Sequence, residues 1–309
     1  MKGSSLVGYA LTLGIAAALP AGCGGAQSGV PAQLAARPAG AATKSSTLLY
    51  VLQGAHAASV EFVTFPQGKP VGTLPTYGYP TALCSDASGN VWVPFDTGGK
   101  VLVAEFAHGG TVPIAKLLAP LTGAHGCAVD PSSGNLAVLS SAGINGSGKI
   151  LVWNHAVGKP ASYHTWFEPF SAAYDDKGNL FVDGLDESTY VLTELPAGAR
   201  KLHYVAIRHG AVTLGGVQWD GTYVAVEGFR RSDPIYRLKV AGFKAEVVQT
   251  VQLRAVPYEA SFWTNGSTIV ATQRDTKHVG VWTYPTGGAP TERLNGFHDA
   301  TGVVISVGT

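Results

Sequence analysis

The sequence predicts an all-β fold, a six-bladed β-propeller with four strands in each blade, from three observations. Charged residues make up only 13% of the 309, while glycine accounts for 40 and methionine for one, which suits short strands and tight turns better than helices. An apolar strand, a glycine turn and a second apolar strand recur with a period near 44 residues. Six such periods fit between residues 47 and 309, and one period is the length of a four-stranded blade.

The N-terminal segment has the features of a secretory signal. Lys2 provides a positive charge, and residues 6–19 form an uncharged apolar run. The PAGC that follows resembles the lipobox of bacterial lipoproteins, although Pro20 stands where that motif usually has leucine. The resemblance implies that residues 1–22 are removed and that Cys23 is acylated. An ordinary signal peptide cut nearby, or a membrane-spanning anchor, is the alternative interpretation.

A Gly-, Ala- and Pro-rich segment without aromatic residues, 23–46, separates the signal from the repeats. Such a composition cannot bury enough apolar surface to order itself, so we expect a flexible tether. The sequence therefore predicts a signal peptide over 1–22, a tether over 23–46 and the propeller over 47–309. It also predicts an exported protein, periplasmic or on the cell surface, held to the membrane through its N-terminal lipid.

The charge of the chain argues against a nucleic-acid partner. Removal of residues 1–22 takes away one basic residue, Lys2, and leaves 20 basic and 20 acidic residues. No basic run or stripe interrupts this balance, whereas nucleic-acid binding needs one. The partners we expect besides the membrane are a protein, a small molecule or a carbohydrate.

The repeat unit is clearest in three segments and weaker in two more: 82–93, 127–138, 172–182, then 216–226 and 261–271. The residues after the turn glycine are Asn90, Asn135, Asn179, Thr222 and Ser267, at intervals of 45, 44, 43 and 45. A third strand follows in each period: 100–106, 149–154, 190–195, 235–240 and 279–284. The tryptophans inside these strands, Trp219 and Trp263 among them, are interpreted as packing between blades.

The two ends of the repeat region predict how the ring closes. Residues 48–53 (LLYVLQ) match the second strand of a blade, whereas residues 302–307 (GVVISV) match a first strand. The C-terminal strand should therefore join the blade that the N-terminal strand begins, which removes free sheet edges.

The turns resemble those of a known propeller family. DASGNVWV (86–93) and DPSSGNLAV (130–138) are similar to NHL-repeat propellers and their gluconolactonase- and regucalcin-like relatives. The resemblance implies a scaffold, because the motif shapes a hairpin and has no chemistry of its own. In the gluconolactonase-like relatives a Glu and Asn/Asp side chains hold a divalent cation, and Glu259 and Asp299 stand at comparable positions. The loops that would supply the other ligands differ, so no metal or other cofactor is predicted beyond this possible cation.

The loops that lead into the first strands should surround the mouth of the central channel, the usual site of a propeller. Their polar and aromatic residues are the candidate ligand site: Tyr79, His125, Trp166, Glu168, Tyr258, Glu259, His298 and Asp299. We interpret the protein as a binding or scaffolding module rather than an enzyme, and assign no catalytic residue. The alternatives are a metal-dependent, lactonase-like hydrolase or lyase at the channel mouth, and a carbohydrate-binding protein that uses Trp166.

Two cysteines, Cys84 and Cys127, fall in the first strands of neighbouring repeats. Their opposite parity relative to the turn places them on opposite faces of successive blades, as a bridge between the blades would need. The alternative is a pair of buried free thiols.

Overall fold

A computed structural model describes residues 47–54, 58–141, 146–208, 212–228, 234–254, 261–272 and 277–309. The predicted signal peptide, Cys23 and the tether lie outside these ranges, as do the candidate site residues Tyr258 and Glu259. Within the described ranges, no helix has the length and apolar character needed to cross a bilayer.

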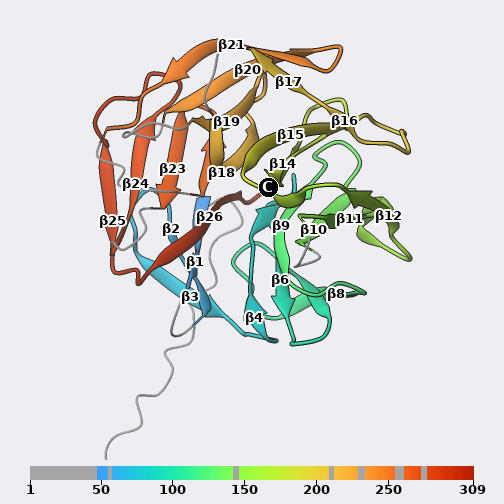
Figure 1. The fold of residues 1–309 in the computed structure, drawn as a ribbon. Coiled ribbons are helices and arrows are strands. Elements are labelled where there is room, and N and C mark those ends of the chain that lie inside the picture. The colour runs from blue at the N-terminus through green and yellow to red at the C-terminus, as the bar shows by residue number, and fades with distance from the viewer. Residues whose placement is uncertain are drawn as a thin grey trace, which may run out of the picture. The chain divides into compact units, whose positions relative to one another are not determined.

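The strands of the described part form six separate sheets that follow one another around a central axis (Figure 1). Neighbouring strands within each sheet are antiparallel, apart from one short parallel pair in blade 5. The only helical element among these residues is a single 3-10 turn, η1 (Asn154–Ala156). The predicted all-β, six-bladed propeller is therefore confirmed.

The blades are numbered along the chain, and within each blade the strands are named from the innermost outwards. Blade 1 contains β26 (Ala300–Val307), β1 (Thr47–Gln53), β2 (Ser59–Thr64) and β3 (Pro70–Leu74). Blade 2 contains β4 (Tyr79–Pro80) and β5 (Cys84–Ser85), both paired with β6 (Val91–Asp96), then β7 (Val101–Phe106) and β8 (Pro113–Ala119). Blade 3 contains β9 (Ala124–Val129), β10 (Leu136–Ser141), β11 (Gly148–Trp153) and β12 (Ala161–Thr165).

The second half of the ring repeats this order. Blade 4 contains β13 (Glu168–Tyr174), β14 (Leu180–Asp186), β15 (Thr189–Leu195) and β16 (His203–Tyr204). Blade 5 contains β18 (Val212–Trp219), β19 (Val224–Gly228), β20 (Ile235–Ala241) and β21 (Lys244–Val251), with β17 (Ala206–Arg208) parallel to β21. Blade 6 contains β22 (Phe262–Asn265), β23 (Thr268–Thr272), β24 (His278–Thr283) and β25 (Glu292–Asn295).

The repeated Asp–Gly–Asn turn connects the first and second strands through one carboxylate. Asp175 Oδ1 accepts the backbone N–H groups of Lys177 at 2.9 Å and of Asn179 at 2.8 Å, and Asn179 Nδ2 donates to Asp175 Oδ2 at 2.8 Å. Gly178 between them has a φ of 76°, which glycine adopts without steric cost. The motif thus makes a tight hairpin, as the sequence predicts.

The ring closes where β1 pairs antiparallel with β26, with Tyr50 opposite Val304. Five consecutive residues of β1, Leu48–Leu52, are buried on both faces, because blades 2 and 6 cover the two sides of blade 1. The predicted closure of the C-terminal strand onto the N-terminal blade is confirmed.

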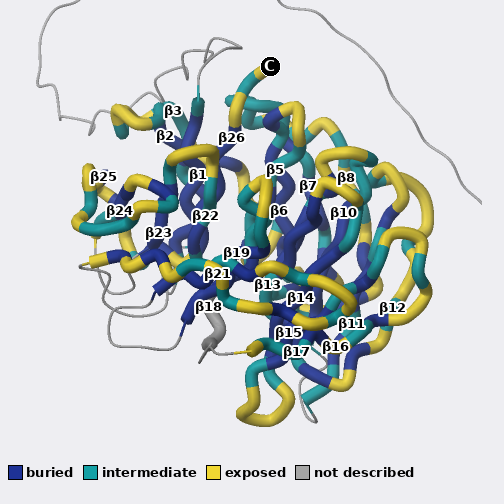
Figure 2. The backbone as a smooth tube through the Cα atoms, turned by 90° about the horizontal axis from the view of Figure 1, so that it is seen from above, coloured by how far each residue is buried: buried dark blue, intermediate teal, exposed yellow. Residues whose placement is uncertain are grey.

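The core consists of apolar layers between neighbouring blades, and Figure 2 shows the buried strands inside a rim of exposed turns. Between blades 2 and 3, Trp153 and Leu151 pack against Val103 and Cys84. Each large side chain buried in this way contributes about 1.5–3 kcal/mol. Because the blades pack face to face, only their inner strands are left to line the central channel.

Candidate binding site at the channel mouth

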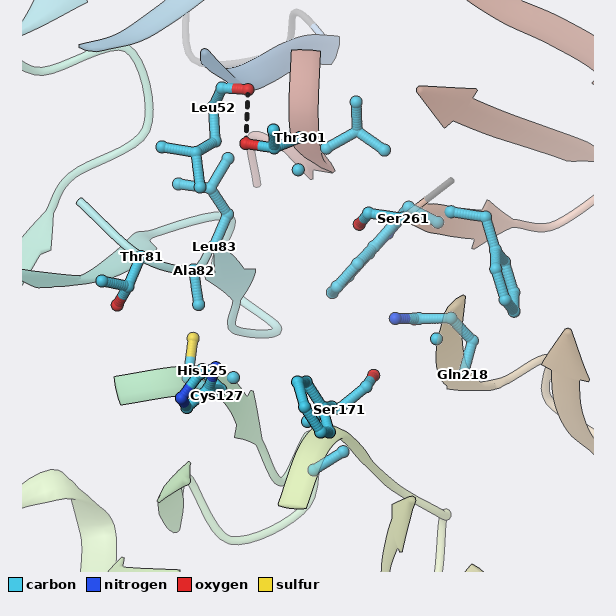
Figure 3. A pocket seen from close by; sticks show the side chains of 18 residues that line it. Leu52, Thr81, Ala82, Leu83, His125, Cys127, Ser171, Gln218, Ser261 and Thr301 are labelled. Atoms are coloured by element: carbon cyan, nitrogen blue, oxygen red, sulfur yellow. Dashed lines mark hydrogen bonds between the residues drawn. The ribbon is translucent and has the colours of Figure 1, made fainter. Parts of the chain in front are cut away.

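A cavity of about 350 Å³ lies at one end of the central channel, and all six blades line it (Figure 3). Its polar lining side chains, one from each blade, are Thr301, Thr81, His125, Ser171, Gln218 and Ser261. Figure 3 shows the Gln218 amide extending toward the middle of the space. Three aromatic residues add flat apolar surface: Phe170, Phe262 and Trp263.

A second cavity of about 190 Å³ continues the channel away from this mouth. In blade 3 the first cavity contacts residues 125–127 and the second contacts 127–129, and blade 4 shows the same progression from 170–172 to 172–174. Since each inner strand passes one cavity and then the other, the two are successive parts of one channel.

The inner strands approach one another closely around the cavity. A Cβ atom added at Gly126 would lie 2.4 Å from the carbonyl oxygen of Phe170 in the next blade. Real Cβ contacts of that length do not occur, so blades 3 and 4 could not keep this spacing with any other residue at position 126. The glycine therefore sets the width of the channel at this point.

The cavity has an uncharged lining. No Asp, Glu, Lys or Arg is among the described residues that line it. His125 Nε2 lies 2.8 Å from Ser141 Oγ, and its ring meets Phe170 edge-on with 5.2 Å between centroids. Burial lowers the pKa of His125, and the negative charge of Glu168 opposes this only in part. The imidazole is therefore neutral at pH 7, and the cavity offers dipoles rather than charges.

Three more of the predicted site residues lie outside the cavity lining. Tyr79 is 51% exposed in β4, and Trp166 is 46% exposed with its ring edge-on to Phe167 at 5.2 Å. Glu168 is half-buried at the start of β13, where its charge acts on His125. The structure thus brings His125 and Glu168 close enough to interact, but Tyr79 and Trp166 do not line the cavity.

His298 and Asp299 shape the turn into β26 through their backbones. The N–H of His298 donates to Gln53 Oε1 at 2.5 Å, and the N–H of Gly54 donates to the carbonyl of Asp299 at 2.8 Å. Asp299 has a φ of 52°, which aspartate tolerates better than most residues. In the structure both residues hold the end of β1 against the turn into β26, and neither lines the cavity.

The described residues do not fit a divalent cation. Nowhere among them do three or more His, Cys, Asp or Glu side chains gather as a metal site would need, and the cavity lining contains no carboxylate. Hard cations take several oxygen ligands, and carboxylates are regularly among them. Of the two candidate metal ligands, Asp299 does not line the cavity and Glu259 lies outside the described residues.

The structure joins Cys84 and Cys127 by a disulfide, with Cα atoms 5.7 Å apart. The bond connects β5 to β9, the inner strands of blades 2 and 3, and Cys127 contacts both parts of the channel. Of the two interpretations from the sequence, the structure has the bridge rather than two free thiols.

Several cavity residues were not predicted from the sequence, including Gln218, Ser261 and Thr301. Trp263 packs between blades 6, 1 and 2, as its position in a strand predicts, but it also contacts both parts of the channel. Gln218 and Thr301 lie in first strands and Ser261 directly precedes one, and this position is the only signal in the sequence. The prediction instead singled out other polar and aromatic residues of the loops that lead into those strands.

Comparisons with known proteins support the fold alone. No protein-family model and no curated protein matches the chain. Among solved structures, one from the nidogen/laminin complex is 13% identical with a TM-score of 0.64, covering 85% of this chain and 99% of that one. A protein of unknown function from Bacteroides caccae is 14% identical, with a TM-score of 0.61 over 85% of this chain and 99% of that one. TolB from Acinetobacter baumannii is 13% identical, with a TM-score of 0.60 over 84% of this chain and 66% of its own. At these identities the likeness defines the class of the chain as a β-propeller and no more.

Proposed function

We propose that the chain is an exported, membrane-tethered binding module whose channel mouth takes a neutral polar ligand. The observation that carries the proposal is the cavity of about 350 Å³ with dipolar and aromatic side chains and no charged ones among its described lining. The Asp–Gly–Asn turns support a relationship to the NHL-repeat propellers. This resemblance implies that the chain is a scaffold. No catalytic step is assigned.

The chemistry of the lining selects the class of ligand. A charged group would lose its hydration in this cavity without meeting an opposite charge. A neutral ligand with several hydroxyl or amide groups can exchange hydrogen bonds with Gln218, Ser261 and His125, and its apolar face can contact Trp263. A sugar ring combines these two properties, so we propose a neutral carbohydrate, free or attached to a larger partner.

A glycan array tests this proposal, with titration of any neutral hit by calorimetry. Gln218→Leu removes the amide dipole from the cavity, and Trp166→Ala removes an exposed aromatic ring outside it. We expect Gln218→Leu to weaken binding at least about tenfold, since it leaves ligand polar groups unpaired. Tyr204→Ala is the matched control, because Tyr204 is 54% exposed on β16, at the outer edge of blade 4.

The proposal fails if no neutral glycan binds, or if Gln218→Leu binds as tightly as the parent chain. A hit that Trp166→Ala weakens and Gln218→Leu does not would place the ligand at Trp166 instead of in the cavity.

The proposed tether rests on the PAGC motif and is tested separately. The chain should incorporate radiolabelled palmitate and partition into detergent when expressed in a bacterium, and Cys23→Ser should abolish both. Labelling that survives Cys23→Ser would contradict acylation at this residue. Secretion of the Cys23→Ser chain without an anchor would support export by the same signal.

A further inference from the structure

A groove of about 620 Å³ lies on the outer side of the ring between blades 2 and 3, and it shares no residue with the channel. We call it the lysine groove. Its lining includes three lysines and four apolar residues: Lys100, Lys149, Lys159, Leu118, Leu151, Pro120 and Pro160. Its lining residues come from β8 of blade 2, from β11 and β12 of blade 3 and from the connections next to these strands.

The groove has an apolar side that water contacts. Leu118 is 58% exposed, and it lies on β8, which has no partner strand on its outer side. Leu151 is buried in the layer between blades 2 and 3, and Lys149 precedes it by two residues on the same face of β11. This strand therefore places an ammonium group next to the apolar layer.

Within the described residues, no carboxylate pairs with the lysines of the groove. No Asp or Glu lines it. Across the described residues the one salt bridge joins Arg237 to Asp220 in blade 5, so no carboxylate oxygen of these residues lies within 4.0 Å of the three lysine amino groups. Three unpaired cations beside exposed apolar carbon favour an occupant with the opposite charge and an apolar part.

We propose that the lysine groove binds a small amphiphilic anion, with its anionic head between the lysines and its apolar body against Leu118 and Leu151. A volume of about 620 Å³ is within the range of small-molecule sites, about 300–1,000 Å³. A stable protein partner would instead need about 800 Å² of surface on each side. Membrane recruitment typically uses four to eight basic residues in one cluster, more than the groove offers.

Calorimetry with monomeric octyl phosphate in detergent-free buffer tests the proposal on the purified chain. We expect one molecule to bind, and binding to weaken as salt is added, since the lysine contacts are exposed to solvent. Octan-1-ol and inorganic phosphate, which each present half of the probe, should bind at least about tenfold more weakly.

Paired variants locate the site. Lys149→Gln with Lys159→Gln should weaken octyl phosphate binding about tenfold, and Leu118→Ser should also weaken it. The matched control is Lys239→Gln with Lys244→Gln, which makes the same change of charge at two exposed lysines of blade 5 and should leave binding unchanged.

Three results would overturn the proposal. The first is no binding of octyl phosphate, and the second is equal weakening by the groove pair and the control pair. The third is recruitment of the Cys23→Ser chain, which lacks the proposed lipid anchor, to anionic lipid vesicles that monomeric octyl phosphate does not reverse, since the groove would then be a membrane contact.

Discussion

Cys84 and Cys127 connect the inner strands of blades 2 and 3 at the wall of the channel, and 43 residues separate them in the chain. Almost the whole of one blade period lies inside the loop that the disulfide closes. The bond therefore restricts the unfolded chain over the segment that must form the second, third and fourth strands of blade 2.

Replacing both cysteines, Cys84→Ala with Cys127→Ala, should lower the free energy of unfolding by about 2–4 kcal/mol, because a loop of this length loses that much closure entropy. Urea denaturation measures the loss. A reducing agent should produce a similar loss in the parent chain and none in the variant. In a thiol assay of the denatured, unreduced parent chain, only Cys23 should react, and only where it is not acylated. Free thiols at Cys84 and Cys127 would show that the bridge is wrong.

A buried carboxylate gives the protein a pH dependence of unusual sign. Asp183 in β14 is completely buried, and its Oδ1 accepts the N–H of Ser171 at 2.8 Å, while Oδ2 has no hydrogen-bond partner among the described residues. Burial raises the pKa of Asp183 to about 7, against the lowering effect of the Ser171 hydrogen bond. The folded state therefore holds a proton that the unfolded state has already lost near pH 4.

Stability should fall as pH rises from 4 to 7, because the unfolded state ionises Asp183 freely while the folded state must keep it protonated. Between pH 5 and pH 8 we expect a loss of about 2–3 kcal/mol in the free energy of unfolding. Asp183→Asn keeps the acceptor for Ser171 and cannot ionise, so its stability should change less over this range. Urea denaturation at both pH values measures the difference. Equal slopes for the two proteins would show that Asp183 does not titrate there.

The charge of Glu168 should be measurable through His125. Burial lowers the pKa of His125, and Glu168 raises it in part, so Glu168→Gln should lower the pKa further. Titration of the imidazole signal by NMR measures this shift. Glu187→Gln, an exposed carboxylate on the next hairpin of blade 4, is the control. A pKa of His125 that rises or stays constant in Glu168→Gln would show that the charge of Glu168 does not act on the imidazole.

The fold could be predicted from the sequence because its determinants are local. The alternation of apolar residues and the Asp–Gly–Asn turns recur in each blade, and Asp175 with Asn179 forms the hairpin that such a turn requires. The ring closure could also be predicted, since residues 48–53 and 302–307 match different strands of one repeat.

Apart from His125, the polar residues of the cavity could not be predicted, because the strand register shifts near the mouth. The pairing of the first and second strands shifts between Pro169 and Ser171 in blade 4, and between Val212 and Val217 in blade 5. A shift of one residue turns every following side chain to the other face of the sheet. Alternation in the sequence therefore does not show that Ser171 and Gln218 face the channel.

Substitutions at two turn glycines can measure how much ring closure contributes to stability. Gly89 has a φ of 81° and Gly134 a φ of 70°, so alanine at either position is strained by about 1–2 kcal/mol. Nothing lies within 4 Å of a Cβ atom added at Gly134, whereas one at Gly89 would lie 2.3 Å from the carbonyl oxygen of Val307 in β26. The carbonyl of Gly89 also accepts a hydrogen bond from the hydroxyl of Ser306.

Gly134→Ala should therefore cost only the backbone strain, while Gly89→Ala should also displace the end of the closing strand. We expect the loss in the free energy of unfolding to be larger for Gly89→Ala by at least about 2 kcal/mol, since the carbonyl loses its donor and the blades separate locally. Urea denaturation of the two variants gives the difference directly. Equal losses would mean that blade 2 does not hold β26 in place, and that the pairing of β26 with β1 closes the ring alone.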